Sequence, residues 1–211
     1  MSYSSASMAL HGPTLTLRPP VAADAPALLE LASDPEVTRW FSWGPYTSID
    51  EPLGYIAEAA ARRERGEQVD LLVVHRALGP AGITGLSEFS ARDLRCVVGT
   101  WFGRHFWGTG ANRESKALIA HLAFGVLGMH RLGSYSNPGN VRSTRALLGL
   151  GFRLEGVLRD WHRHDGRHHD VNVFGLLRSE WEGGPLVEVP VRVEGEPPAA
   201  FGRVGAVVGG C

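Results

Sequence analysis

An apolar run, a glycine turn and a long amphipathic pattern follow one another between Cys96 and Gly128, and this succession constrains the fold most. The run ends at Phe102, and the turn carries Gly108 and Gly110. The order predicts a buried strand, a tight loop and a helix. Glycine lets the backbone approach a ligand closely, and the free N–H groups of a helix's first turn carry partial positive charge. The stretch therefore predicts a phosphate site at the start of the helix.

The helical pattern has one apolar face between Glu114 and Leu127, where apolar residues recur at steps of three and four. Gly128 offers a C-terminal stop. A glycine pair before a helix also fits a structural turn that packs the helix against its strand. Neither G-x-G-x-x-G nor G-x-x-x-x-G-K-[ST] occurs in the chain, which excludes the dinucleotide and Walker fingerprints.

Strand and helix signals flank this stretch on both sides. Before it, the patterns predict strands at 15–18, 70–75 and 83–89 and helices at 24–33 and 48–66. After it, they predict a strand at 130–136, a short helix at 140–149 and strands at 152–164 and 167–177. Asp165-Gly166 joins the last two as a hairpin turn. Consecutive strands on short turns favour antiparallel pairing.

Length and composition limit the kinds of protein that this chain can be. A chain of 211 residues suits one domain, and a formal net charge of −1 provides no field for nucleic acid or anionic membranes. The two cysteines, Cys96 and Cys211, give no disulfide framework, and the N-terminus lacks a signal-peptide pattern. We therefore expect a cytoplasmic protein with no membrane segment. We expect a flexible N-terminus over 1–13, one folded domain over 14–182 and a loosely packed Gly/Pro/Val-rich tail over 183–211.

The loop His105-Phe106-Trp107-Gly108-Thr109-Gly110 resembles the acyl-CoA-binding loop of the GNAT (Gcn5-related) N-acetyltransferase superfamily, [Q/R]-x-x-G-x-[G/A]. Histidine stands where the family usually has Gln or Arg. The segments 137–143, 150–152 and 155–160 are similar to the branch of ribosomal-protein-alanine N-acetyltransferases, the Rim-type enzymes. The resemblance extends over roughly 15–181.

This resemblance implies an α/β (α+β) fold with a mostly antiparallel mixed sheet of about seven strands and helices on both faces. The sheet splays between its fourth and fifth strands, and the pantetheine arm of acetyl-CoA lies in the gap. The residues implied to bind the cofactor are Thr100, Trp101, Phe102, His105, Trp107, Gly108, Thr109, Gly110, Ala111, Asn112, Asn140 and Ser143.

Two of these residues take individual roles from the resemblance. Asn140 would bind the pantetheine amide, and Ser143 would hydrogen-bond or protonate the leaving thiolate. Helix capping is the alternative for both, and Asn140 can do both at once. The implied acceptor pocket is aromatic, although the same rings could simply close the core. Its expected residues are Trp40, Phe41, Trp43, Tyr46 and Tyr135.

The general base is the position where this chain departs from the family. Relatives commonly carry a Glu on the fourth strand where this sequence has Val97. Glu88 is the leading replacement, because it lies in a strand expected to neighbour the one that ends at Phe102. Facing the cleft, it would be partly desolvated with a raised pKa. The alternatives are a solvent-facing Glu88, with Tyr135, Asp160 or bulk water taking the proton.

The leading hypothesis is an N-acetyltransferase that moves acetyl from acetyl-CoA directly to a primary amine, on a protein N-terminus or a small molecule. One alternative is a transferase that uses aminoacyl-tRNA, against which the near-neutral charge argues. Another is a non-catalytic module that binds acyl-CoA or a partner. The chain would act as a monomer or homodimer. We expect no metal at the hairpin histidines His162, His164, His168 and His169, because no carboxylate or thiolate has the right spacing.

Overall fold

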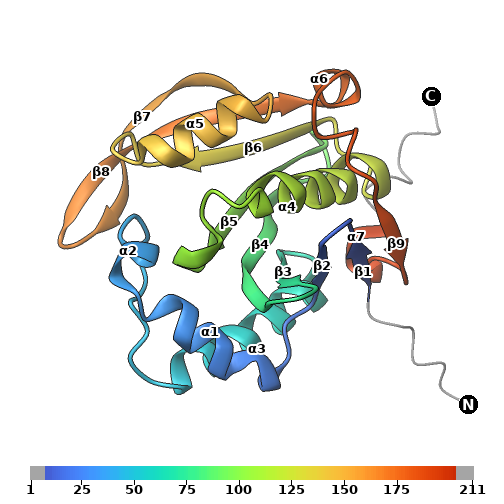
Figure 1. The fold of residues 1–211 in the computed structure, drawn as a ribbon. Coiled ribbons are helices and arrows are strands. Elements are labelled where there is room, and N and C mark those ends of the chain that lie inside the picture. Colours follow the sequence, from blue (N-terminus) through green and yellow to red (C-terminus); the bar gives the residue numbers. More distant parts are fainter. Residues whose placement is uncertain (1–7, 203–211) are drawn as a thin grey trace, which may run out of the picture.

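A single sheet runs through the computed structural model, which describes residues 8–202. Its strands are β1 (Ala9–His11), β2 (Leu15–Arg18), β3 (Val69–His75), β4 (Gly79–Ser90), β5 (Arg95–Phe102), β6 (Arg131–Ser136), β7 (Arg153–His164), β8 (Arg167–Leu177) and β9 (Arg192–Glu194). Their order across the nine-stranded sheet is β7-β8-β6-β5-β4-β3-β2-β1-β9 (Figure 1). The strands beyond the expected seven are the short β1 and β9 at one edge.

Helices cover both faces of this sheet (Figure 1). The α-helices are α1 (Ala25–Ala32), α2 (Pro35–Thr38), α3 (Asp50–Arg65), α4 (Ala111–Ala120), α5 (Val141–Gly149), α6 (Arg178–Glu182) and α7 (Ala199–Gly202). The 3₁₀ turns are η1 (Ala22–Asp24) and η2 (Arg104–Phe106), and η3 (His121–Val126) is a π-helix. The predicted α/β class with a mostly antiparallel sheet is confirmed. None of the described helices is long and apolar enough to cross a membrane.

Strand alternation divides the core into two parts. Leu71 of β3 packs in a cluster with Leu118 of α4 and Leu147 of α5, whereas its neighbour Leu72 packs with α1 and α3. Successive strand residues point to opposite faces, so each face has its own apolar layer. Helices α4 and α5 therefore share one face of the sheet, and α1 and α3 share the other.

One pair of neighbouring strands is parallel, and it separates early. β5 and β6 pair only at Arg95↔Arg131, Cys96↔Leu132 and Val97↔Gly133. Beyond Val97, β5 continues beside β4 as far as Phe102, while β6 continues beside β8 as far as Ser136. Because β1 adds a strand at the start, β5 and β6 are the expected fourth and fifth strands. The expected splay between them is thus present.

The predicted long helix starts earlier than its apolar pattern and changes type along its length. It begins at Ala111, and its last part, from His121, is π-helical. The Arg178 guanidinium donates to the carbonyl oxygens of Phe124 and, at 2.9 Å, Met129. Carbonyl groups that end a helix need such partners, and a side chain distant in sequence supplies them here.

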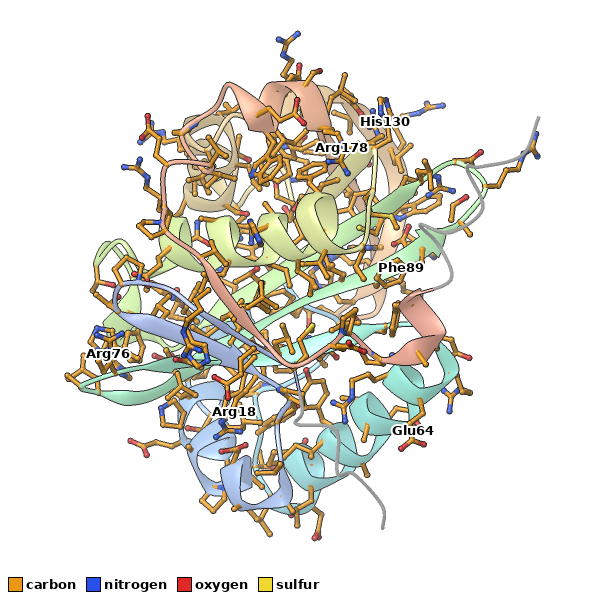
Figure 2. All side chains as sticks on the ribbon, turned by 90° about the vertical axis from the view of Figure 1, so that its right-hand side faces the viewer. Arg18, Glu64, Arg76, Phe89, His130 and Arg178 are labelled. Atoms are coloured by element: carbon orange, nitrogen blue, oxygen red, sulfur yellow. The ribbon has the colours of Figure 1, made fainter. Side chains whose placement is uncertain are left out.

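The chain ends pack more tightly than the sequence predicted. Residues 8–13 were expected to be flexible, yet Leu10 lies in β1 with 0% exposure. The tail from 183 was expected to be loose, yet β9 pairs with β1 and Phe201 is 2% exposed. The ring of Phe201 in α7 lies 4.9 Å from that of Phe89, which Figure 2 labels. Apolar side chains spaced through a Gly- and Pro-rich segment anchor it to the core. Residues 1–7 and 203–211 lie outside the described part of the chain.

If the tail is part of the core, Phe201→Ala should lower the free energy of unfolding by roughly 3 kcal/mol, through lost burial and the cavity left behind. Val187→Ala, at a site that is 45% exposed in the same segment, is the matched control and should change it by less than about 0.5 kcal/mol. Urea unfolding followed by circular dichroism measures both. Equal values for the two variants would mean that the tail is not packed.

Candidate active site

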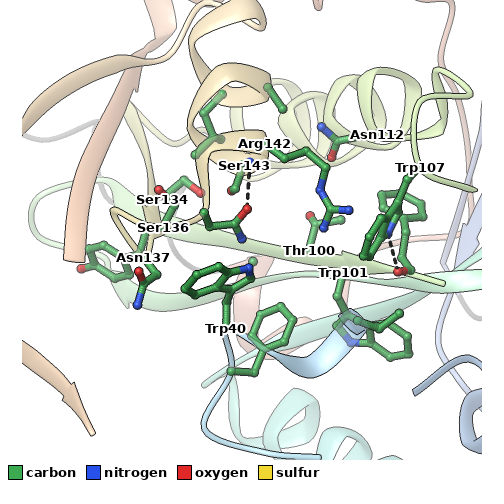
Figure 3. A pocket seen from close by; sticks show the side chains of 18 of the residues that line it. Trp40, Thr100, Trp101, Trp107, Asn112, Ser134, Ser136, Asn137, Arg142 and Ser143 are labelled. Carbon is green, nitrogen blue, oxygen red and sulfur yellow. Dashed lines mark hydrogen bonds between the residues drawn. The ribbon is translucent and has the colours of Figure 1, made fainter. Parts of the chain in front are cut away.

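A cleft of about 500 Å³ opens where β5 and β6 separate. Figure 3 shows side chains from β5, β6, α4, α5 and the loop after α2 turned toward it. Its charged or titratable lining residues are Lys116, Tyr135, Arg142 and His162. The described lining contains no aspartate or glutamate, so the cleft suits an anionic or neutral ligand better than a cationic one.

The free edge of β5 forms the floor of the cleft. Val98 C=O accepts a hydrogen bond from Ser134 Oγ of β6 at 3.0 Å, so it points toward the gap. Alternate residues of a strand turn their backbone groups to the same side, so those of Thr100 and Phe102 point there too. Phe102 C=O accepts from Trp107 Nε1 at 3.0 Å (Figure 3). The carbonyl groups of Val98 and Phe102 thus already accept hydrogen bonds. Thr100 lies between them, and its backbone groups are available to a ligand in the gap.

The glycine turn closes one end of the cleft. Gly108 and Gly110 have φ angles of +77° and +91°, which favour glycine, and a Cβ at either position would meet open space. The requirement for glycine is therefore conformational. Gly110 precedes α4, and its carbonyl accepts from Arg113 N–H at 2.9 Å. This leaves the positive end of the helix facing the cleft.

Helix α4 is fixed to the sheet beside that turn. Glu114 accepts hydrogen bonds from the N–H groups of Thr14 and Leu15, both at 2.7 Å, at the start of β2. Asn112 and Lys116, four residues apart and hence on one helix face, line the cleft. Lys116 Nζ donates to Thr100 Oγ1. The helix thus presents one amide and one amine to the gap.

The start of α5 forms the opposite wall. Asn140 caps the helix, because its Oδ1 accepts from Ser143 N–H at 3.1 Å, and both residues line the cleft. The capping alternative for Asn140 is therefore confirmed as a structural role. The Arg142 guanidinium carbon lies 3.2 Å from the centre of the Trp107 ring, so Arg142 spans the cleft toward the glycine turn (Figure 3). The pair links the start of α5 to the turn that precedes α4.

Aromatic rings form the wall on the α1 side. Phe41 stacks on Trp43 at 5.2 Å, and Trp43 meets Trp101 of β5 edge-on at 5.5 Å. Trp40 lies against the loop before α5, where a Cβ at Gly139 would come within 2.9 Å of its ring. The rings of Trp40, Phe41, Trp43 and Trp101 line the cleft, so they do more than close the core.

Five predicted site residues, Tyr46, His105, Thr109, Ala111 and Glu88, lie outside the lining of the cleft. Tyr46 packs behind Trp43 at 5.3 Å. His105 is exposed and lies against Phe106, with ring centres 4.2 Å apart. Thr109 Oγ1 donates to Phe106 C=O at 2.9 Å, and the Ala111 side chain is buried in the core. Ala111 can therefore contact a ligand only through its backbone, and the Thr109 hydroxyl is already engaged as a donor. Tyr46 and His105 instead pack against residues that do line the cleft, Trp43 and Phe106.

The predicted desolvation of Glu88 is wrong. Glu88 is exposed, has a φ of +50° at an irregularity between β4 and β5, and does not line the cleft. The irregularity breaks the simple alternation on which the prediction rested. Its carboxylate instead accepts from Tyr135 Oη at 3.1 Å, and Tyr135 does line the cleft. Burial and the Glu88 charge raise the pKa of Tyr135.

The cleft also contains residues that were not predicted to line it. Arg142 and Lys116 carry its potential positive charges, and His162 lies at its rim with its ring centre 6.3 Å from that of Tyr135. Partial desolvation and nearby His164 lower the pKa of His162, which favours the neutral ring at neutral pH. A single lysine inside an apolar helical pattern was the available signal for Lys116. His162 was considered only as one of the hairpin histidines, because a register shift in β7, which the sequence pattern does not reveal, sets its position.

The hairpin histidines are not gathered into a cluster. His164 and His169 stack with their ring centres 3.7 Å apart. No three His, Cys, Asp or Glu side chains within residues 8–202 are arranged to hold a metal ion.

Comparisons with known proteins agree with this geometry. The chain is 29% identical over 175 residues to the N-acetyltransferase p20 of Bacillus licheniformis, an alignment that covers 82% of this chain and 98% of p20. Its structure is similar to that of a GCN5-related N-acetyltransferase from Brucella melitensis, with a TM-score of 0.75, 25% identity and coverage of 82% and 80% of the two chains.

RimL, the ribosomal L7/L12 alpha-N-protein acetyltransferase, solved in complex with coenzyme A, shares the fold. The TM-score is 0.70 at 22% identity, over 78% of this chain and 94% of RimL. The acetyltransferase (GNAT) domain family matches residues 14–153, which is more than half of the sequence. The protein is therefore a member of the GNAT acetyltransferase family.

Proposed function

We propose that this protein transfers acetyl from acetyl-CoA directly to a primary amine. The observation that carries the proposal is the free edge of β5. The Thr100 backbone groups face the gap between two occupied carbonyls, and the gap leads to the positive end of α4. An extended pantetheine arm with its amides matches such an edge, and a pyrophosphate matches the helix start.

The donor would be held from both walls. Its pyrophosphate would lie over Gly108–Asn112, with Arg142 close enough across the cleft to supply positive charge. Its pantetheine amide would meet Asn140, whose side-chain nitrogen is free to donate while its oxygen caps α5. Of the remaining proposed cofactor residues, Thr109 and Ala111 would contact the donor through their backbone. His105 would act indirectly, by packing against Phe106.

The chemistry then follows from position. The acceptor amine enters on the aromatic side and attacks the thioester carbon, and the Thr100 N–H stabilises the oxyanion that forms. One preorganised donor of this kind contributes on the order of 3 kcal/mol. The C–N bond forms, the C–S bond breaks, and Ser143 donates a proton or hydrogen bond to the departing thiolate.

The proton released by the amine has a path out of the cleft. Tyr135 Oη can accept it while passing its own proton to Glu88, 3.1 Å away. Glu88 keeps its proposed role as the final acceptor, but acts through Tyr135 instead of facing the thioester. Neutral His162 at the rim is the second candidate base.

The acceptor is proposed to be a protein N-terminus, as the name of RimL states for that enzyme, or a small-molecule amine. The rings of Trp40, Phe41, Trp43 and Trp101 would hold the group that carries the amine. A panel of amines and of peptides with different N-terminal residues, assayed for release of free CoA thiol, tests the function. Release with none of them would favour the non-catalytic alternative.

Gly110→Asp should abolish the thermal stabilisation that acetyl-CoA gives, because a carboxylate at the start of α4 repels the pyrophosphate. Gly110→Asn is the matched control, since asparagine has the same shape, no charge and a tolerance for positive φ. Thermal shift with and without acetyl-CoA measures both. If Gly110→Asp is stabilised as much as the parent, the phosphate site lies elsewhere.

Ser143→Ala should lower kcat more than it raises the KM for acetyl-CoA, because a hydrogen bond to the departing thiolate strengthens in the transition state. Steady-state kinetics with the best acceptor from the panel measures both constants. An unchanged kcat would assign Ser143 a structural role at the start of α5.

Tyr135→Phe and Glu88→Gln should each lower kcat/KM by roughly two orders of magnitude near neutral pH. Activity should partly recover at high pH, because the acceptor amine then loses its proton without help. The double variant should be no worse than the poorer single one if the two act in series. Activity equal to the parent at every pH would exclude this path and leave His162 or bulk water.

A further inference from the structure

The donor side of the cleft contains a buried amine. Lys116 is the only lysine in the sequence, and it is 4% exposed. It lies on the same face of α4 as Asn112, one turn beyond the helix start, and it lines the cleft. Long side chains on a helix lean toward its N-terminus, so Lys116 approaches the end at which an anion would bind.

Hydroxyl groups surround this amine. Lys116 Nζ donates to Thr100 Oγ1, which lies 2.7 Å from Thr84 Oγ1. Thr84 Oγ1 in turn donates to Gly99 C=O at 3.3 Å. In one consistent arrangement, the amine donates to Thr100, Thr100 donates to Thr84, and Thr84 donates to the carbonyl of Gly99. These uncharged groups can accept a hydrogen bond from an ammonium group, but they cannot neutralise its charge.

The charged groups on α4 and on the elements packed around it are already engaged or carry no negative charge. On α4, Glu114 binds Thr14 and Leu15, and Arg113 lies 3.4 Å from Glu188. On the packed strands, Arg18 of β2 pairs with Asp24 of η1, and Glu88 of β4 accepts from Tyr135 of β6. On α5, the nearby group is Arg142, which is itself cationic. No described carboxylate forms an ion pair with Lys116.

An unpaired ammonium is costly to bury, and burial lowers the pKa of Lys116 to about 7. In the ligand-free protein the amine therefore loses its proton as the pH rises through neutrality. An anionic donor would supply the missing negative charge.

We propose that Lys116 is a donor-binding residue that takes up a proton when the anionic acyl-CoA enters the cleft, completing the positive site formed by Arg142 and the start of α4. This inference rests on the proposed function. Thr100 Oγ1 would hold the Lys116 side chain in place, so that its positive charge lies between the thioester beside Thr100 and the phosphates at the start of α4.

The sign of the pH dependence follows. Because the complex binds more protons than the free protein, affinity for the donor falls as pH rises above about 7. The limiting slope is about tenfold per pH unit, and it persists until the pKa of Lys116 in the complex is reached. Binding measured above pH ~7.5 is little affected by titration of the donor's own phosphates, which have lost their protons by then.

Calorimetric titration with acetyl-CoA at about pH 8, in two buffers of different ionisation enthalpy, counts the protons. The parent protein should take up close to one. Lys116→Met should bind at least about tenfold more weakly and take up none. Lys116→Arg, always charged, should bind with no uptake. His162→Gln should retain the uptake, since the lowered pKa of His162 leaves its ring neutral at this pH.

Several results would overturn the inference. Binding by the parent without proton uptake would contradict it and leave the proposed function intact, as would Lys116→Met binding as tightly as the parent. Loss of the uptake in His162→Gln would assign the proton to that ring. Acetylation of Lys116, detected by intact mass after incubation with acetyl-CoA, would make it an acceptor. No binding of acetyl-CoA by the parent at any pH would reject the proposed function as well.

Discussion

The separation of β5 from β6 is the constraint on which the rest of the site depends. Buried backbone groups must be paired, and a strand that leaves its neighbour exposes an unpaired edge. Here Ser134 satisfies Val98 C=O and Trp107 satisfies Phe102 C=O. The edge is thereby reduced to the groups around Thr100. The glycine turn and α4 follow closely after the end of the same strand, so one continuous segment supplies the extended edge and the proposed anion site.

Charge is distributed unevenly around this opening. Lys116 and Arg142 face it, while the carboxylates of Glu88 and Glu114 are held outside by Tyr135 and by the start of β2. A carboxylate beside the donor phosphates would weaken binding through repulsion. The same exclusion leaves no carboxylate in the described lining to act as a general base beside the proposed position of the thioester. In the proposed mechanism, Tyr135 reconciles the two requirements by linking the cleft to Glu88 outside it.

The sequence predicted those parts of the structure that depend on local patterns. The strand, glycine turn and helix from Cys96 to Leu127 follow from periodicity and turn residues, and all are present. Glu88 was misplaced because a backbone irregularity in β4 overrides strand alternation. Phe201 was missed because burial of a chain end depends on tertiary contacts. Lys116 and His162 became site candidates only when packing and register placed them beside Thr100 and Tyr135.

The account stands on the donor lying as an added strand along β5. Hydrogen–deuterium exchange of the protein with and without acetyl-CoA measures this most directly. Amides of 98–102 and 108–112 should be slowed together, with Thr100 the most protected residue of β5, while the β1–β9 edge is unchanged. Protection confined to other segments, or none at a saturating donor concentration, would contradict the assignment of this cleft.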